Sequence, residues 1–248
     1  MVGRRGVAGG GPPVSDERWL TTIWPFVREH LPPAPGRVLE VGCGPAGGFV
    51  PALLSAGYDA VGIDPAAPGG PDYRQVPFEE HPVDVPADAI VACISLHHAA
   101  DPDGVLDRMA AALAPGGVVI VVEWAHERFD ERTATWCFDR LAGTGEPNWL
   151  HRRRDRWKES GLPWDDHRAA RAHQGSLYDG RRIVAGLHGR FRTRLSEEGP
   201  YFFADLDGVT AADEQAAIDS GRIQATGLRY VGTRLDFAAP PGSAPGDG

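Results

Sequence analysis

The sequence is short of cysteine, of basic residues relative to acidic ones, and of long apolar runs. Its cysteines, Cys43, Cys93 and Cys137, are widely separated and lack a paired C-x-x-C spacing, which disfavours a disulfide framework, a zinc site or a redox motif. No apolar run approaches the roughly 18 residues of a membrane span, and residues 1–13 lack the apolar core of a secretion signal. We therefore predict a protein of the reducing cytoplasm with no membrane segment.

Basic residues are outnumbered, since 25 lysines and arginines stand against 34 aspartates and glutamates, for a net charge of −9. Phosphate backbones repel such a chain, which disfavours general binding of nucleic acid. The one strongly basic stretch, residues 151–158, contains Trp157 and could meet RNA or an acidic substrate. Because Asp155 and neighbouring acidic residues dilute it, a solvated helix face is the more ordinary interpretation.

The length of 248 residues, with 42% hydrophobic and 24% charged residues, suits one α/β domain with an insertion. Residues 1–14 and 238–248 are rich in glycine and proline and are predicted to be disordered tails. The predicted single domain covers residues 15–237. Within it, residues 125–190 combine histidines, tryptophans and arginines with helical patterning, which predicts an inserted helical region.

Apolar runs alternate with helical segments along this domain, as in a parallel α/β sheet with helices on both faces. The predicted strands cover residues 37–41, 59–63, 72–76, 89–94, 117–123, 191–195 and 226–237. The predicted helices cover residues 15–31, 46–56, 103–113 and 211–220. The run 89–94 is continuously apolar, which is typical of a strand buried on both faces.

A glycine-rich turn, residues 42–48, joins the first predicted strand to a helix. In doubly wound sheets, ligands bind at this carboxyl end of a strand, and glycine lets the backbone approach them closely. Asp64 ends the second predicted strand, where its carboxylate can accept hydrogen bonds from both hydroxyls of a ribose. The spacing therefore predicts a cofactor that contains adenosine.

The glycine pattern Gly42-x-Gly44-x-x-Gly47 also satisfies the dinucleotide fingerprint, so an NAD-dependent oxidoreductase is one alternative. Charge favours another cofactor. Glu40 lies two residues before Gly42, and no lysine or arginine occurs between Val38 and Tyr73. Such surroundings suit a ligand with an ammonium and a sulfonium group better than a pyrophosphate.

The segment from Val38 to Gly44, Val-Leu-Glu-Val-Gly-Cys-Gly, resembles the first motif of class I S-adenosylmethionine (SAM) dependent methyltransferases. Residues 88–98, 113–117 and 227–232 are similar to later motifs of that family, in the same order. The resemblance covers roughly residues 15–125 and 190–237. It implies a Rossmann-like α/β fold with a seven-stranded, mostly parallel sheet, helices on both faces and a helical lid, with S-adenosylhomocysteine as the product of the cofactor.

The resemblance also implies a set of cofactor-binding residues that follow strand ends. They are Glu40, Gly42, Cys43, Gly44, Asp64, Pro65, Phe78, Glu79 and Ile94. Glu40 and the backbone of residues 42–44 would hold the methionine end, Asp64 the ribose, and Phe78 with Glu79 the adenine.

Three residues are candidates for catalysis. His97 and His98 follow the fourth predicted strand, close to where the methyl group should lie, and histidine suits proton transfer near neutral pH. Either one could instead cap Asp101 or lie packed in the loop. Glu123 ends the fifth predicted strand and is a second-rank candidate, with ordering of the loop as its alternative role. No spacing indicates a metal site.

Methyl transfer to the oxygen, nitrogen or carbon of a small organic acceptor is the predicted reaction. Most tryptophans lie from Trp124 onward, where the family shapes its acceptor pocket, and they suit an apolar or aromatic acceptor or simply a small core. Other hypotheses are a cyclisation or decarboxylation on the same fold, an RNA methyltransferase, and a SAM-binding module without catalysis. The oligomeric state does not follow from the sequence.

Overall fold

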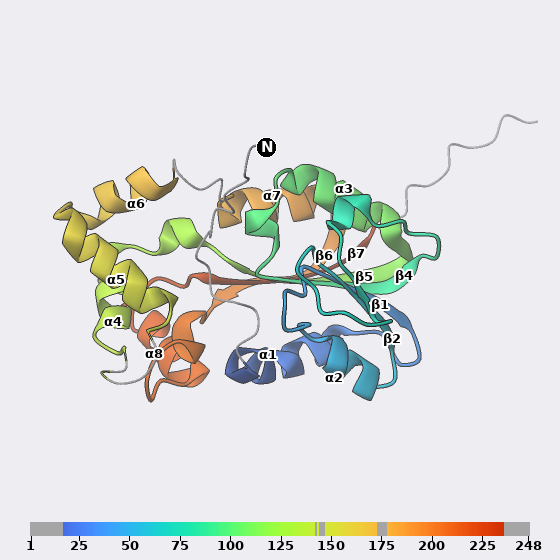
Figure 1. The fold of residues 1–248 in the computed structure, drawn as a ribbon, viewed down its shortest axis with the longest axis horizontal. Coiled ribbons are helices and arrows are strands. Elements are labelled where there is room, and N and C mark those ends of the chain that lie inside the picture. The colour runs from blue at the N-terminus through green and yellow to red at the C-terminus, as the bar shows by residue number, and fades with distance from the viewer. Residues whose placement is uncertain (1–16, 142, 144–146, 173–177, 236–248) are drawn as a thin grey trace, which may run out of the picture.

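The structure, a computed structural model, describes residues 17–141, 143, 147–172 and 178–235 (Figure 1). The tails predicted at residues 1–14 and 238–248 lie outside the described residues. The described chain forms a seven-stranded sheet between two layers of helices (Figure 1). The strands are β1 Arg37–Val41, β2 Asp59–Ile63, β3 Tyr73–Arg74, β4 Ala87–Cys93, β5 Leu113–Trp124, β6 Phe191–Gly199 and β7 Gly227–Arg234.

The strand order in the sheet is β3-β2-β1-β4-β5-β7-β6. Neighbouring strands from β3 to β5 run parallel, whereas β7 pairs antiparallel with both β5 and β6. The prediction of a seven-stranded, mostly parallel α/β sheet is confirmed. The chain leaves β1 toward β2 on one side and reaches β4 on the other, so a crevice lies outside the carboxyl ends of β1 and β4, where such sheets bind ligands.

Helices cover both faces of the sheet. The described α-helices are α1 Glu17–His30, α2 Val50–Ser55, α3 Pro102–Ala112, α4 Glu131–Phe138, α5 Trp149–Ser160, α6 Trp164–Ala172, α7 Gly180–Arg190 and α8 Ala211–Asp219. Figure 1 shows α1 and α2 below the sheet and α3 and α7 above it. Short 3-10 turns complete the chain at η1 Phe78–Glu80, η2 Leu96–His98, η3 His126–Arg128 and η4 Phe202–Ala204.

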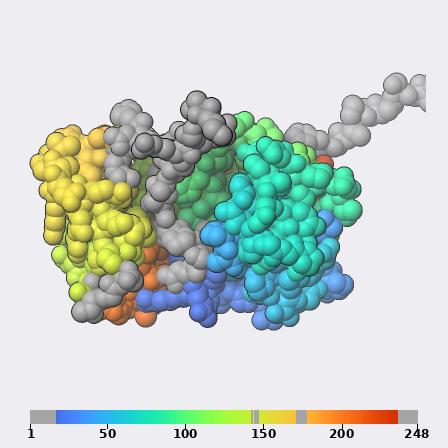
Figure 2. Space-filling view, in the orientation of Figure 1, coloured from blue at the N-terminus to red at the C-terminus, as the bar shows by residue number. Residues whose placement is uncertain are grey.

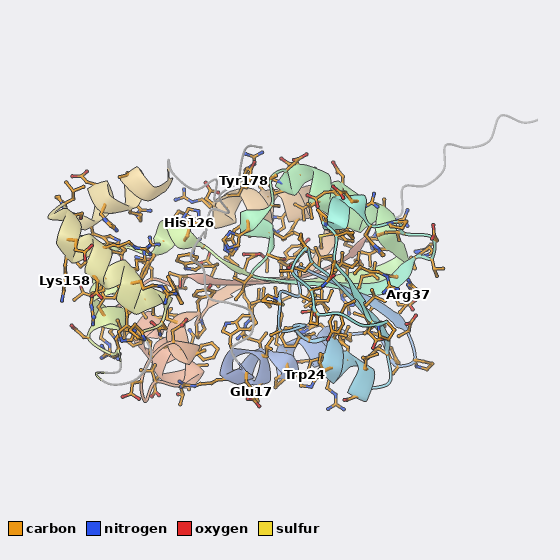
Figure 3. The ribbon with its side chains drawn as sticks, in the orientation of Figure 1. Glu17, Trp24, Arg37, His126, Lys158 and Tyr178 are labelled. Carbon is orange, nitrogen blue, oxygen red and sulfur yellow. The ribbon has the colours of Figure 1, made fainter. Side chains whose placement is uncertain are left out.

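Alternate side chains of the central strands enter two separate cores. Val38 joins the core beneath the sheet with Trp19 and Ile23 of α1, whereas Leu39 and Val41 join the core above it with residues of α3 and α7. Figure 3 shows Trp24 of α1 in the lower layer, where its ring stacks on Phe49 at 6.0 Å. The same alternation directs Glu40 toward the lower layer, next to α2.

β3 covers only Tyr73–Arg74 of the predicted 72–76, and β6 continues to Gly199, beyond the predicted end at residue 195. Two further boundaries differ from the sequence prediction for identifiable physical reasons. Helix α2 begins at Val50 rather than at residue 46, because Gly47 and Gly48 have φ angles of +87° and +55°, which a helix cannot contain. Strand β5 begins at Leu113, four residues before the predicted 117, because Leu113 already pairs with Ala87 of β4. Both differences lie outside the strand ends that carry the site.

Among its described residues, the region predicted as a helical insertion contains four α-helices, which differ in where they pack. Helix α7 lies against α3, β6 and β7, so it belongs to the upper layer of the sheet. Helices α4, α5 and α6 instead extend beyond the end of β5, and Figure 2 shows α5 and α6, in yellow, at one end of the molecule. Their role as a lid stays a prediction.

Candidate active site

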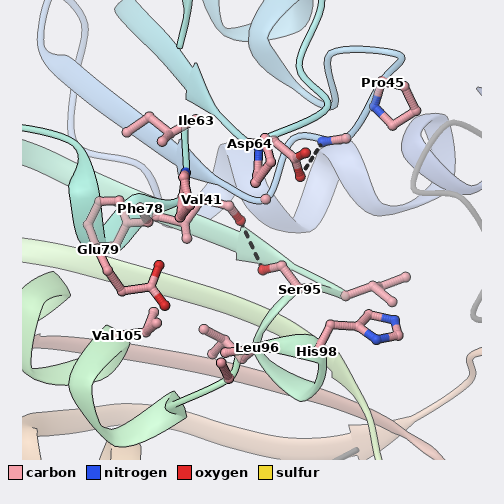
Figure 4. Close-up of a pocket in the computed structure, with 17 residues that line it drawn as sticks. Val41, Pro45, Ile63, Asp64, Phe78, Glu79, Ser95, Leu96, His98 and Val105 are labelled. Atoms are coloured by element: carbon pink, nitrogen blue, oxygen red, sulfur yellow. Dashed lines mark hydrogen bonds between the residues drawn. The ribbon is translucent and has the colours of Figure 1, made fainter. Parts of the chain in front are cut away.

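A cavity of about 520 Å³ opens at the carboxyl ends of β1, β2 and β4 (Figure 4). Its walls come from four loops: residues 41–45 after β1, 63–65 after β2, 77–79 at η1, and 94–100 at η2. Predicted cofactor residues that line it are Gly42, Gly44, Asp64, Pro65, Phe78, Glu79 and Ile94. The fold thus brings to one cavity residues that the sequence separates by more than fifty positions.

The glycine turn fits tightly against the loop that follows β4. Gly42 has a φ angle of +80°, and a Cβ atom there would lie 2.2 Å from the Cβ atom of Ser95. The Ser95 hydroxyl donates a hydrogen bond of 2.9 Å to the carbonyl oxygen of Val41 (Figure 4). Only glycine leaves both loops room at this approach.

Asp64 stands at the end of β2 and faces the glycine turn. Its carboxylate accepts a hydrogen bond of 3.1 Å from the backbone N–H of Gly44 (Figure 4). It also accepts one of 2.7 Å from the backbone N–H of Ala66. Each oxygen has a further lone pair, so the carboxylate can also accept hydroxyl hydrogens from a ligand in the cavity.

The opposite wall of the cavity is formed by η1. Phe78 is buried, and the guanidinium of Arg108 lies 5.8 Å from the centre of its ring. Glu79 is exposed and also lines the cavity, together with Val105 of α3 (Figure 4). An apolar ring beside an exposed carboxylate can hold a flat base and accept a hydrogen bond from its amino group.

Ile94, at the end of β4, has a φ angle of +51°. A β-branched residue rarely adopts this left-handed conformation, which costs of order 1–3 kcal/mol and persists only where its surroundings enforce it. The turn at Ile94 redirects the chain from β4 into η2, so that Ser95 and His98 border the cavity. The strained residue is therefore one of those that line the cavity.

Glu123 is fully buried at the end of β5 and holds η2 in place. Its carboxylate accepts backbone hydrogen bonds from Ser95 and Leu96, each at 2.7 Å, and from Trp124 at 3.1 Å. The fourth contact is His97 Nδ1, 2.6 Å from Oε2. Burial alone would raise the pKa of Glu123, but His97 and the backbone donors outweigh it and lower that pKa.

The two histidines of η2 have different surroundings. His98 is exposed and lines the cavity (Figure 4), whereas His97 is completely buried and does not line it. Their rings lie 4.0 Å apart. Partial loss of hydration and the adjacent His97 ring lower the pKa of His98, which favours its neutral form at neutral pH.

Glu40 and Cys43 lie behind the glycine turn rather than in the cavity wall. Both Glu40 oxygens accept from the N–H of Phe49, at 2.8 and 3.0 Å, at the start of α2. A Cβ atom on Gly48 would lie 2.2 Å from Glu40 Oε1, and the Cys43 sulfur faces Gly62. Glu40 thus anchors the turn to α2, and its predicted contact with the methionine end stays a prediction.

One sequence comparison bears on the identity of this site. A family model described as a methyltransferase domain matches residues 17–183, which is more than half of the chain. The chain belongs to this methyltransferase family. The predicted resemblance to SAM-dependent methyltransferases is thereby confirmed, and the matched residues include the whole glycine turn, Asp64 and η2.

Solved structures share the fold of this methyltransferase at low sequence identity. A SAM-dependent methyltransferase from Mesorhizobium loti is 18% identical with a TM-score of 0.52, covering 86% of this chain and 97% of the other. The N-methyltransferase NodS from Bradyrhizobium japonicum, in complex with S-adenosylhomocysteine, is 14% identical with a TM-score of 0.50, covering 89% of each chain. Geranyl diphosphate C-methyltransferase from Streptomyces coelicolor A3(2) was solved in complex with Mg²⁺, geranyl diphosphate and S-adenosylhomocysteine. It is 15% identical with a TM-score of 0.50, covering 88% of this chain and 80% of the other. No curated protein matches the chain in sequence.

Two residues at or next to the cavity were not predicted from the sequence as site residues. The position of Ser95 could have indicated its role, since it directly follows β4 at the carboxyl edge of the sheet. For Tyr178 no such indication exists: its N–H donates to the carbonyl oxygen of His97 at 3.2 Å and its hydroxyl to that of Ala100 at 3.0 Å, across about eighty residues. Figure 3 shows Tyr178 on the side of the sheet that carries α3 and α7.

Metal-binding clusters and membrane-spanning helices are both absent from the described part of the methyltransferase. Within the described ranges, no group of three or more histidines, cysteines, aspartates or glutamates could hold a metal ion. Among the helices that the structure describes, none combines the length and the apolar character needed to cross a membrane.

The pH dependence of methyltransferase stability is expected to report on Glu40. Burial raises the pKa of Glu40 from 4.5 to about 8 in the folded protein. A carboxyl group whose pKa is raised by folding stabilises the fold fully at pH values below its pKa in the unfolded chain. This contribution is lost as the pH rises through its pKa in the folded protein. The free energy of unfolding should therefore fall from about pH 5 to about pH 8, and fall less steeply in Glu40→Gln.

Urea denaturation at several pH values checks this, with the exposed Glu159→Gln as the control. Glu214, whose pKa burial raises to about 7, contributes with the same sign in every variant, so the slope is expected to be reduced and not abolished. Equal slopes for Glu40→Gln and the wild type would contradict the expectation.

Proposed function

We propose that this methyltransferase moves a methyl group from SAM to the oxygen, nitrogen or carbon of a small organic acceptor, and that the cavity at residues 42–45, 64–65 and 77–79 holds the SAM. The observation that carries the proposal is the charge of the cavity. Among the described residues that line it, Asp64 and Glu79 are acidic and none is lysine or arginine. A cationic ammonium and sulfonium suit this lining, whereas a pyrophosphate does not.

The shape of the cavity supports an adenosine in a defined orientation. Asp64 can accept the ribose hydroxyls, while Phe78 and Glu79 can flank the adenine. The glycine turn leaves its backbone bare toward the opposite end, where a Cβ atom on Gly44 would meet nothing within 4 Å. The methionine part would lie there, which directs the methyl group toward η2.

The protein's own contribution to methyl transfer is alignment. When bound, SAM supplies a methyl carbon that is already an electrophile on a good leaving group. The residues of η2 then have to exclude water and orient the acceptor, because position and desolvation of the nucleophile provide most of the rate in such a displacement. Glu123 holds this loop through the backbone N–H groups of Ser95 and Leu96, so the loop is positioned before an acceptor arrives.

Calorimetric titration with SAM, S-adenosylhomocysteine and NAD tests the proposal. The expected result is binding of the two SAM-type ligands and no binding of NAD. Asp64→Ala is expected to weaken SAM binding about 100-fold or more, because two hydrogen bonds to a charged group are lost, each worth about 1.5–3 kcal/mol. The exposed Asp166→Ala is the matched control and should bind as the wild type does.

Binding of NAD without SAM would overturn the proposal. So would an Asp64→Ala variant that binds SAM with unchanged affinity, since the carboxylate at the end of β2 would then lie outside the cofactor site.

A further inference from the structure

One side chain of α3, that of Arg108, holds the turn η1 in place. Its guanidinium donates a hydrogen bond of 2.8 Å from Nε to the carbonyl oxygen of Phe78, and another from Nη2 to the carbonyl oxygen of His81. Phe78 is the first residue of η1 and His81 directly follows its last residue. Arg108 therefore grips the turn at both of its ends.

The turn that Arg108 grips carries two residues of the cofactor cavity. The ring of Phe78, whose centre lies 5.8 Å from the guanidinium carbon of Arg108, lines the cavity together with Glu79 (Figure 4). Arg108 itself is not among the described residues that line the cavity. It can consequently influence a bound ligand only through η1.

The backbone of η1 gives the turn little hold on the rest of the fold. The N–H of Glu80 donates to the carbonyl oxygen of Pro77 at 3.0 Å, and the N–H of His81 donates to that of Phe78 at 3.2 Å. Both bonds close the turn on itself, and their geometry in a 3-10 turn is poorer than in an α-helix. The position of η1 against the cavity therefore depends on side-chain contacts such as those of Arg108.

Arginine suits this task better than the other basic residue. A guanidinium presents several N–H donors in one fixed plane, so a single side chain can hold two carbonyl oxygens at a set distance from each other. A lysine ammonium is a compact charge on a flexible stem and cannot reproduce that geometry. The contacts of Arg108 therefore fix the orientation of η1 as well as its place.

We propose that Arg108 is a positioning residue that makes the cofactor site selective for adenine over other purines. It holds η1 where the Glu79 carboxylate accepts a hydrogen from the 6-amino group of the base. Hypoxanthine has an oxygen at this position, which cannot donate and which a carboxylate repels. This inference rests on the proposed function, in which Phe78 and Glu79 flank the adenine.

Titration calorimetry with S-adenosylhomocysteine and its hypoxanthine analogue, S-inosylhomocysteine, tests the proposal without an acceptor and without turnover. The wild type is expected to bind the adenine compound about 10- to 100-fold more tightly, the range for one hydrogen bond to a charged group. Arg108→Gln should reduce this ratio to below about 3-fold, because η1 no longer holds Glu79 against the base. A purely structural Arg108 would weaken both ligands equally and leave the ratio unchanged.

Two further variants separate position from charge and from general disturbance of α3. Arg108→Lys keeps the charge but can reach one carbonyl oxygen at a time, so its ratio should lie between those of the wild type and Arg108→Gln. Arg190→Gln is the matched control, because Arg190 also contacts α3, through Asp107 at 2.6 Å, next to Arg108 in the chain. It should keep the wild-type ratio.

A double-mutant cycle shows whether Arg108 acts through Glu79. The amide of Glu79→Gln can accept from a 6-amino group and donate to a 6-oxo group, so this variant alone should lose most of the selectivity. Residues that act through one contact give non-additive effects. Arg108→Gln should therefore change the ratio no further when it is combined with Glu79→Gln.

The proposal is overturned if Arg108→Gln keeps the wild-type ratio, if the wild type binds both compounds alike, or if the two substitutions lower the ratio independently. Circular dichroism establishes that each variant is folded, and Arg108→Lys takes the place of an Arg108→Gln variant that is not. A wild type that binds neither compound would instead contradict the proposed function, so the two failures are distinguishable.

Discussion

Replacement of Glu123 by alanine is expected to lower the free energy of unfolding by at least about 3 kcal/mol, because a buried donor that is left without its acceptor costs about 1–3 kcal/mol. Four donors lose their acceptor at once: the backbone N–H groups of Ser95, Leu96 and Trp124, and His97 Nδ1. All of them lie at the junction of β4, β5 and η2, where water has little access to replace the lost carboxylate. The loss should therefore destabilise the fold as well as the site.

Urea denaturation followed by circular dichroism measures this effect, with the exposed Glu159→Ala as the control. Glu123→Gln keeps one oxygen acceptor in place and should cost clearly less than the alanine variant. A change below about 1 kcal/mol in Glu123→Ala would show that the hydrogen bonds to the carboxylate contribute little net stability.

The role of Glu123 illustrates how far the sequence could be interpreted. Its place at the end of a strand predicts a candidate catalytic residue, with ordering of the loop as the alternative role. In the structure, its carboxylate accepts from the loop backbone at Ser95, as the alternative role requires, and it also contacts His97. The sequence could not separate His97 from His98, because neighbouring residues in a 3-10 turn point in different directions. Which of them meets the cavity depends on the left-handed turn at Ile94, and no pattern predicts a β-branched residue in that conformation.

Strand positions were the most predictable part of the fold. β1 and β2 lie at the predicted residues, because each is a short apolar run that ends at a turn or a carboxylate. The alternation of side chains within β1 also predicts the layer that each residue enters. Glu40 shares a face with Val38, and its carboxylate accepts from the N–H of Phe49 at the start of α2.

Long-range partners were beyond the sequence. Tyr201 follows β6, yet it stacks on Trp124 at the end of β5, because β7 brings the two strand ends to the same edge of the sheet. Periodicity reports which face of its own element a residue occupies, and it carries no information on such a pairing. The contact between Tyr201 and Trp124 consequently depended on the structure, whereas the loops that line the cavity followed largely from strand ends and their order.

Gly42→Val is expected to reduce SAM affinity about 1,000-fold or more, equivalent to roughly 4 kcal/mol. The φ angle of +80° is disfavoured for valine, and even the first side-chain carbon would lie 2.2 Å from the Cβ atom of Ser95. The two loops must separate to admit it, which moves the turn away from Asp64, whose carboxylate accepts from Gly44 N. The cavity would lose its shape on the side formed by the glycine turn.

Gly69→Val is the matched control for this variant, because Gly69 is exposed and a Cβ atom there would meet nothing within 4 Å. Titration calorimetry gives the affinities, and circular dichroism establishes that each variant is folded.

A double variant separates the effect of the clash with Ser95 from the effect of the backbone strain at Gly42. Gly42→Ala combined with Ser95→Gly removes the clashing carbon while keeping the unfavourable φ angle, so the double variant should recover part of the affinity that Gly42→Ala loses. If it recovers none, the close approach of the two loops is not what requires glycine at this position, and the backbone conformation alone does.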